Sequence, residues 1–146
     1  MILREILQSK GTLVRTIDAS DSLESVVQEL VRHNCGSLVV CDSQSASRRM
    51  VGIITERDIL RACASHRGAL SDLRVSEAMT VNVVVGSPHD SIEDTMGLMT
   101  NRRIRHLPVI DDDELIGLIS IGDIVKTQHD RLTMENHYLK SYLHST

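Results

Sequence analysis

The sequence predicts an α/β (α+β) fold in which two pseudo-symmetric β-α-β-β-α repeats pack together as one domain. The main observation is an internal repeat: "DSLESVVQELVRHNCGSLVVCD" at 21–42 aligns with "DSIEDTMGLMTNRRIRHLPVID" at 90–111, and "GIITERDIL" at 52–60 aligns with "GLISIGDIV" at 117–125. A second observation is size, since a unit of about 50 to 60 residues buries too little apolar surface to be stable alone. The two units should therefore pack face to face.

The third observation is that the same elements follow in the same order in each copy. The patterns Asp21-x-x-Glu24 and Asp90-x-x-Glu93 resemble capping boxes at the start of amphipathic helices. Apolar residues recur near helical spacing at Leu23, Val26, Val27 and Leu30 in the first copy and at Ile92, Met96 and Met99 in the second. The runs "SLVVC" and "HLPVI" predict buried strands, "MVGII" and "LIGLI" predict their hairpin partners, and helices follow from "ERDILRACA" and "IGDIVKTQH".

The remaining segments are predicted to be connections and terminal helices. The polar stretch at 43–49 predicts a hairpin loop, and "DDDE" at 111–114 favours an Asp-rich turn over a Mg²⁺ site, which needs converging ligands or a phosphate. The C-terminal segment predicts a helix with Leu132, Tyr138, Leu139 and Tyr142 on one side. We divide the chain into an N-terminal helix at 1–11, a first repeat at 12–67, a linker at 68–79, a second repeat at 80–130 and a C-terminal helix at 131–146.

The composition argues against nucleic acid as a partner and against a membrane protein. The net charge is −4, whereas a general nucleic-acid binder neutralises phosphates with a basic surface. Stacking platforms are missing too, because the chain has no Phe or Trp. No apolar run approaches the roughly 20 residues that cross a bilayer. Arg4 and Glu5 interrupt the N-terminal apolar stretch, so we expect a cytoplasmic protein without a secretory signal.

Neither the cysteines nor the histidines suggest a metal site. Three cysteines without a C-x-x-C pair favour neither a disulfide framework nor a zinc knuckle. His129, His137 and His144 lie two turns apart along the predicted C-terminal helix, which is too far to share an ion. We therefore expect no metal.

The candidate functional motif is a Ser/Thr-x-x-Asp turn at the end of the second strand in each copy, formed by Thr55 and Asp58 and by Ser120 and Asp123. One interpretation is helix capping, in which the hydroxyl accepts from a backbone N–H and the carboxylate lies at the positive end of the helix dipole. The other is ligand binding, because an ionised carboxylate accepts from both hydroxyls of a ribose. The two roles are compatible, and the recurrence of the turn favours binding.

The paired G-h-h-[ST]-x-x-D segments, the duplicated units and "IRHLPVID" resemble a tandem pair of cystathionine-β-synthase (CBS) domains, the Bateman module, over roughly residues 12–130. With nothing else attached, the chain resembles a stand-alone bacterial CBS-pair protein. This resemblance implies a non-catalytic regulatory module that binds AMP, ADP, ATP or NAD(H) in clefts between the repeats. It also implies a homodimer, a regulated partner protein and no catalytic cofactor.

The resemblance assigns roles to particular residues. Asp58 and Asp123 would bind the ribose, and Thr55 and Ser120 would reach a hydroxyl or a phosphate oxygen. Backbone groups near Thr16, Gly36 and Ser37 would bind the edge of the adenine. The ring would lie between aliphatic groups, which is consistent with the absence of Phe and Trp.

Cations are expected beside the phosphate. By resemblance Arg105 and His106 face the cleft of Asp123, where the guanidinium fork suits a phosphate and the imidazole gains charge as the phosphate arrives. We take Cys35 and Gly36 as the uncharged counterparts in the first copy, so we expect the Asp123 site to bind phosphorylated ligands more strongly. Arg57 either compensates at the Asp58 site or faces solvent. We assign Arg102 to a solvated helix end, where a cation suits the negative pole of the dipole.

Two other functions are open at this stage. The first is a dimeric scaffold in which the clefts are degenerate. The second is a small nucleotide-hydrolysing enzyme, which no nucleophile elbow, P-loop or metal motif in the chain supports.

Overall fold

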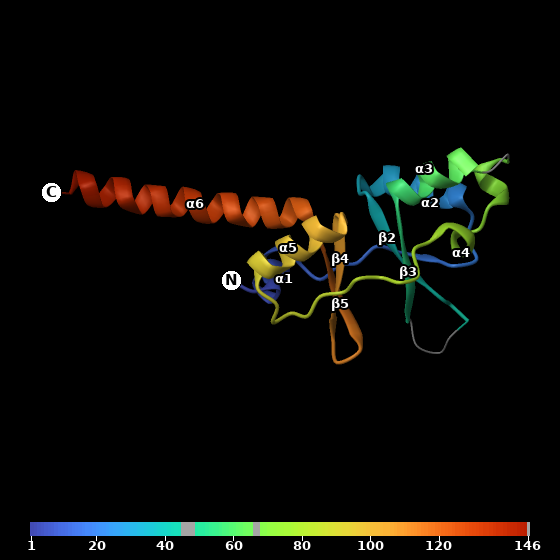
Figure 1. Cartoon of the computed structure of the whole chain (residues 1–146), viewed down its shortest axis with the longest axis horizontal. Coiled ribbons are helices and arrows are strands. Elements are labelled where there is room, and N and C mark those ends of the chain that lie inside the picture. Colours follow the sequence, from blue (N-terminus) through green and yellow to red (C-terminus); the bar gives the residue numbers. More distant parts are fainter. Residues whose placement is uncertain (45–48, 66–67, 146) are drawn as a thin grey trace.

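The two repeats form two lobes that lie side by side in the computed structural model, which describes residues 1–44, 49–65 and 68–145 (Figure 1). The first lobe contains β1 (Thr16–Asp18), α2 (Leu23–His33), β2 (Ser37–Cys41), β3 (Met50–Thr55), α3 (Glu56–Ser65), the 3-10 helix η1 (Leu70–Asp72) and α4 (Val75–Ala78). The second contains α1 (Leu3–Lys10), α5 (Ile92–Arg102), β4 (His106–Asp111), β5 (Glu114–Ser120) and α6 (Ile121–His144). The predicted fold class is confirmed, and each repeat has the predicted order of helix, strand, strand and helix.

In the sheets of the two repeats, the strands pair through equivalent residues. In the first, β1 runs parallel to β2 and β2 runs antiparallel to β3. In the second, β4 and β5 are antiparallel, and the first strand is reduced to an isolated parallel bridge between Gly86 and Val109. This bridge matches the pair Ile17 and Val40 in β1 and β2. The backbone plan is therefore the same in both copies.

The helices α2 and α5 begin one residue later than the capping pattern suggests. Their N-caps are Ser22 and Ser91, whose hydroxyl oxygens accept from the backbone N–H three residues further on, at 3.2 and 3.0 Å. Asp21 and Asp90 instead accept from the backbone N–H three residues earlier, at 3.2 and 2.8 Å. These aspartates stabilise the turn before each helix.

Each repeat has its own hydrophobic core, and each core is completed by a helix from outside the repeat. The α1 helix packs Leu3, Ile6 and Leu7 into the second core, although it precedes the first repeat in the chain. Val75 of α4 fills the matching place in the first core. Two extended segments, one from α1 to β1 and one from α4 to α5, cross between the lobes (Figure 1). The stretch 68–79, expected to be a linker, thus contains η1 and α4.

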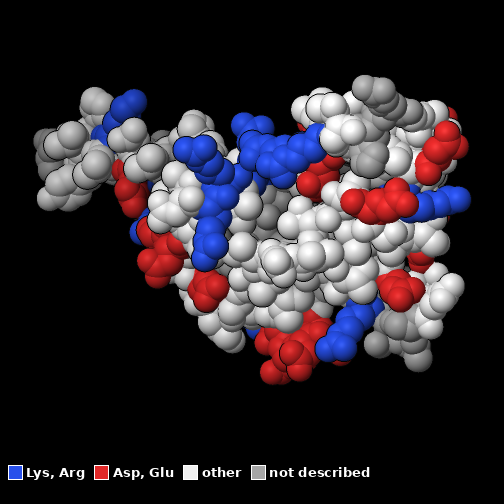
Figure 2. All heavy atoms as spheres, turned by 45° about the vertical axis from the view of Figure 1, so that its right-hand side comes forward, with Lys and Arg blue, Asp and Glu red and all other residues white. Residues whose placement is uncertain are grey.

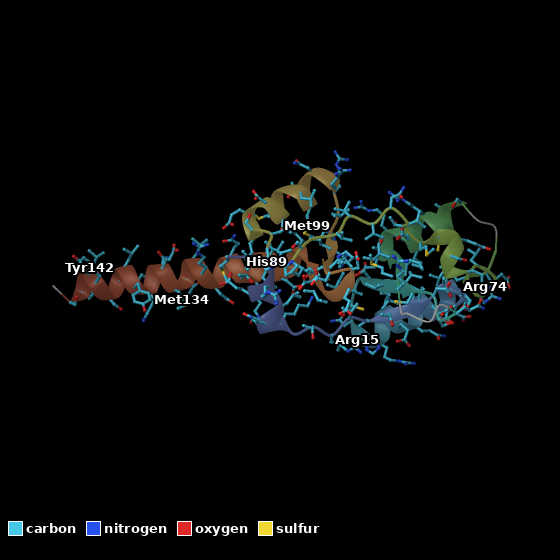
Figure 3. The ribbon with its side chains drawn as sticks, turned by 90° about the horizontal axis from the view of Figure 1, so that it is seen from below. Arg15, Arg74, His89, Met99, Met134 and Tyr142 are labelled. Atoms are coloured by element: carbon cyan, nitrogen blue, oxygen red, sulfur yellow. The ribbon has the colours of Figure 1, made fainter. Side chains whose placement is uncertain are left out.

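The C-terminal segment continues α6 rather than forming a separate helix at 131–146. No proline or glycine follows Gly122 within α6, so the helix is not interrupted before His144. Arg131 pairs with Glu93 of α5 at 3.6 Å, and every described residue from 131 onward is exposed. This half of α6, including Met134 and Tyr142, projects away from the lobes (Figures 1 and 3).

The hairpin between β4 and β5 has the turn expected at 111–114. Asp112 and Asp113 have φ angles of 47° and 64°, as both central residues of a type I′ turn require. The other predicted hairpin loop, at 43–49, includes 45–48, which lie outside the described residues. Within the described parts of the chain, no helix combines the length and the apolar character that a membrane span requires.

Candidate functional site

Two clefts lie where the repeats meet, and each combines the Ser/Thr-x-x-Asp turn of one repeat with the strand start of the other. The Asp58 cleft has a volume of about 470 Å³ and is lined by Thr55 and Asp58 on one side and by residues 102–106 on the other. The Asp123 cleft has a volume of about 380 Å³ and is lined by Ser120 and by residues 34–37. Both volumes are in the range of small-molecule sites.

The strand register identifies equivalent residues in the two clefts. Ser37 pairs with Thr55 across β2 and β3, and His106 pairs with Ser120 across β4 and β5. Ser37 is therefore the counterpart of His106, and Gly36 is the counterpart of the residue before His106. The expected counterparts, Cys35 and Gly36, are one residue too early.

Asp58 lies in a closed network of neutral donors. Its carboxylate accepts from the backbone N–H and the hydroxyl of Thr55, at 3.0 and 3.2 Å, and from the hydroxyl of Thr80 at 3.2 Å. Its own N–H donates to the Thr55 hydroxyl oxygen at 3.4 Å. Asp58 is only 6% exposed. The turn therefore caps the start of α3, as the first interpretation of the motif requires.

Asp123 has the same turn but an ionic partner. Ser120 donates its backbone N–H to the carboxylate at 2.8 Å, and the Ser120 hydroxyl oxygen accepts from the Asp123 N–H at 3.1 Å. The ammonium of Lys10 donates to the same carboxylate oxygen at 2.6 Å. Burial opposes ionisation of Asp123, but the hydrogen bonds from Lys10 and Ser120 outweigh it and lower the pKa of this carboxyl.

The arginines gather on the Asp58 side, which corrects the expected position of Arg105. The Asp58 cleft is lined by Arg57, Arg61, Arg102, Arg103 and Arg105. The repeats face each other in opposed orientation, so the strand start of the second repeat meets the turn of the first. Lys and Arg side chains gather at this junction (Figure 2). Arg57 is exposed and also lines this cleft, where its guanidinium donates to the Arg103 carbonyl at 3.4 Å. Arg102, assigned to a solvated helix end, is exposed and also lines this cleft.

His106 and Gly36 form a wall that both clefts share. Burial is the main cause that lowers the pKa of His106; nearby Lys10 and Arg105 lower it further, and Glu56 and Asp123 partly oppose the effect. The imidazole is therefore neutral at neutral pH. A Cβ on residue 36 would lie 2.6 Å from a Glu56 carboxylate oxygen and 3.3 Å from His106, so both side chains would have to move to accommodate it.

One residue that the sequence assigned to a cleft lies outside the lining of both clefts, and several lining residues were not predicted. Thr16 is exposed and is not among the described residues that line either cleft, whereas its neighbour Arg15 lines the Asp123 cleft. Thr80 and Asn82 line the Asp58 cleft. When the repeat alignment is extended before residue 90, Asn82 is the counterpart of Leu13, which lines the Asp123 cleft. No pattern indicated Lys10, because it lies outside the repeat. No group of three or more described His, Cys, Asp or Glu residues is placed to hold a metal ion.

Comparison with known proteins agrees with this architecture. The family model for the CBS domain matches residues 12–65 and 75–130. The mitochondrial CBS domain-containing protein CBSX3 of Arabidopsis thaliana is 32% identical over 97% of this chain and 71% of its own length.

Solved structures give the same result. The CBS-domain containing protein ATU1752 from Agrobacterium tumefaciens is 36% identical, with a TM-score of 0.82 over 88% of this chain and 99% of that one. The CBS domain pair of MJ0100, in complex with 5′-methylthioadenosine and S-adenosyl-L-methionine, is 25% identical, with a TM-score of 0.74 over 87% of this chain and 98% of that one. The chain therefore belongs to the CBS domain family and consists of a tandem CBS pair.

Proposed function

We propose that this CBS pair is a non-catalytic regulatory module that binds adenosine-containing ligands, AMP, ADP, ATP or NAD, between its repeats and signals their presence to a partner protein. The observation that carries the proposal is the construction of the clefts. Asp58, a carboxylate suited to a ribose, lines the first cleft opposite the strand start of the other repeat, and Asp123 is bonded to Lys10 and Ser120, which line the second. The adenosine-type ligands of the MJ0100 pair support a nucleoside in these clefts.

The charges favour the phosphorylated ligand in the Asp58 cleft, contrary to the preference expected from the sequence. Five arginines line this cleft against two carboxylates, those of Glu56 and Asp58. The Asp123 cleft is lined by two cationic side chains, Lys10 and Arg15, and Lys10 already pairs with Asp123. Guanidinium groups bind phosphate oxygens in a fork, so the Asp58 cleft is the better site for a di- or triphosphate.

The backbone of Arg103 supports a role for its guanidinium. Arg103 ends α5 with a φ angle of 54°, and its counterpart Asn34 ends α2 with a φ angle of 48°. Asn adopts this left-handed backbone conformation readily, whereas in most other residues with a side chain the backbone strain costs about 1 kcal/mol. An arginine is therefore present at a position where the fold favours Asn or Gly, and it lines the cleft.

Calorimetry on the intact, ligand-stripped chain tests the proposal. AMP, ADP, ATP and NAD are titrated in turn, and we expect at least one to bind, with ATP tighter than adenosine. Arg103→Asn, which relieves the backbone, should weaken ATP roughly three- to tenfold, in line with the loss of one charge-assisted contact. Arg32→Asn is the control, because Arg32 is an exposed residue of α2 that pairs with Glu29 at 3.0 Å. The absence of heat from every nucleotide would overturn the proposal.

The catalytic alternative has a separate readout. ATP and NAD are incubated with the purified chain and recovered by chromatography, and we expect both to return unchanged.

Because the chain has two Tyr and no Trp, nucleotide that co-purifies with it would dominate absorbance near 260 nm. Extraction and chromatography of that nucleotide would then identify the natural ligand.

We extend the proposal to a homodimer that pairs through α6. Val125, Leu132 and Leu139 recur every seventh residue and are 58–60% exposed, a spacing suited to helix pairing between two copies. Light scattering should give twice the chain mass, and Leu132→Glu with Leu139→Glu should give a monomer, while His137→Glu should not. A monomeric wild-type chain would contradict this. A dimer without nucleotide binding would favour the second candidate, a scaffold with unused clefts.

A further inference from the structure

The ammonium of Lys10 holds the carboxylate on which the proposed ribose contact of the second cleft depends. Lys10 is the last residue of α1, and it donates to Asp123 at 2.6 Å and to the Leu118 carbonyl at 2.7 Å. The side chains of Lys10 and Asp123 are 36% and 23% exposed, and Lys10 lines the cleft beside Ser120.

The equivalent place in the first repeat is filled by a neutral residue. Thr80 donates its backbone N–H to the Ile53 carbonyl at 2.8 Å and its hydroxyl to Asp58 at 3.2 Å. Ile53 and Leu118 are equivalent in the strand register. Lys10 thus makes with one ammonium the two contacts that Thr80 makes with a backbone N–H and a hydroxyl.

The length of α1 explains how the lysine reaches the cleft. The helices α1 and α4 start equivalently, since Leu3 donates to the Asp90 carbonyl at 3.0 Å and Val75 donates to the Asp21 carbonyl at 2.8 Å. However, α1 has 8 residues and α4 has 4. The additional turn carries Lys10 to the second cleft.

We propose that Lys10 determines the ligand preference of the Asp123 cleft: it favours a nucleoside that carries a phosphate over the same nucleoside without one. The inference rests on the proposed function, because it presumes that Asp123 binds a ribose. A nucleoside without a phosphate competes with the Lys10 ammonium for the Asp123 carboxylate and offers the ammonium no other anion. A nucleoside monophosphate gives the ammonium a second anion while the ribose hydroxyls bind Asp123.

The Lys10 ammonium can donate to a phosphate without losing its bond to Asp123. An ammonium has three protons, and Lys10 uses two of them on described residues. The third is available to a phosphate. Among the described residues that line this cleft, Lys10 and Arg15 are cationic and none is a carboxylate, since Asp123 adjoins the lining through its bond to Lys10. A phosphate that enters the cleft therefore meets cations first.

Nuclear magnetic resonance separates the two clefts in the intact chain. The amide signals of Asn34 and Cys35 report the Asp123 cleft, and those of Asn82 and Val83 report the Asp58 cleft. Adenosine and AMP are titrated against wild-type protein and the Lys10→Met variant. The Asn34 and Cys35 signals give a dissociation constant for each ligand, and the ratio of the adenosine constant to the AMP constant measures the preference for AMP. We expect this ratio to fall roughly fivefold in Lys10→Met, as for the loss of a partly exposed charge contact.

Two further variants make the result specific. Lys10→Arg keeps the cation and should keep the preference. Arg4→Met removes a cation from the same helix at an exposed pair with Asp111, at 3.3 Å, and should change nothing. An unchanged preference in Lys10→Met, or an equal fall in Arg4→Met, would overturn the inference alone. If neither ligand shifts any of the four signals in the wild type, the proposed function fails with it.

Discussion

In the first repeat a threonine hydroxyl completes the bonding of Asp58, whereas in the second a lysine ammonium completes the bonding of Asp123. The turns are otherwise alike in backbone and register. Asp58 is buried within the neutral network, whereas Asp123, with its ionic partner, is partly exposed. The repeats have thus kept the frame that positions the carboxylate and have diverged in the charges around it. The arginines of one cleft and the lysine of the other follow from that divergence.

The largest effect should come from the helix that completes the second core. Leu3 is fully buried, so Leu3→Ala should lower the free energy of unfolding by about 2–5 kcal/mol. Val75→Ala, at the equivalent start of α4, removes less volume and should cost about 2 kcal/mol. Urea denaturation measures both. A loss below about 1 kcal/mol for Leu3→Ala would mean that α1 is not part of the second core.

Two equivalent glycines should differ because different groups cover them. A Cβ at Gly52 would lie 2.8 Å from the Thr80 carbonyl oxygen, which is backbone, whereas a Cβ at Gly117 would lie 2.5 Å from a Leu7 methyl, which can rotate away. We expect Gly52→Ala to cost about 2–3 kcal/mol and Gly117→Ala about 1 kcal/mol by urea denaturation. The reverse order would contradict the tight contact between Thr80 and β3.

Local patterns predicted the repeat, the hairpin strands, the two helices of each repeat and both Ser/Thr-x-x-Asp turns, because each depends on the spacing of nearby residues. The position of Arg105 depends on how the two repeats face each other, which no local pattern contains. Lys10 was missed for a similar reason, since only tertiary packing brings α1 beside the second repeat. The N-caps Ser22 and Ser91 were misassigned by one residue because an aspartate that can also cap stands directly before each serine.

The partners of the two carboxylates should contribute unequally to stability. Thr80→Val removes the hydroxyl that donates to a buried carboxylate, and we expect a loss of about 1–2 kcal/mol. Lys10→Met removes a partly exposed ion pair and should cost less than about 1 kcal/mol. Both are measured by urea denaturation at low and high salt. Only the Lys10 effect should shrink in high salt, and an equal salt response in both variants would refute the contrast.

The smallest effect should be the contribution of His106, which lies between the two clefts, to the pH dependence of the free energy of unfolding. Its pKa is lowered from 6.5, chiefly by burial, so folding favours the neutral imidazole against the opposing fields of Glu56 and Asp123. As the pH falls, His106 therefore binds a proton in the unfolded chain at a higher pH than in the folded chain. The contribution of His106 to the free energy of unfolding is fully present above pH 6.5 and is lost as the pH falls below it. Between pH 7.5 and 5.5 the wild type should therefore lose up to about 1 kcal/mol more stability than His106→Gln. The other histidines are common to both proteins, so the difference between them isolates this site. A wild type that loses less than the variant would mean that His106 is protonated in the folded state, with Glu56 and Asp123 outweighing burial.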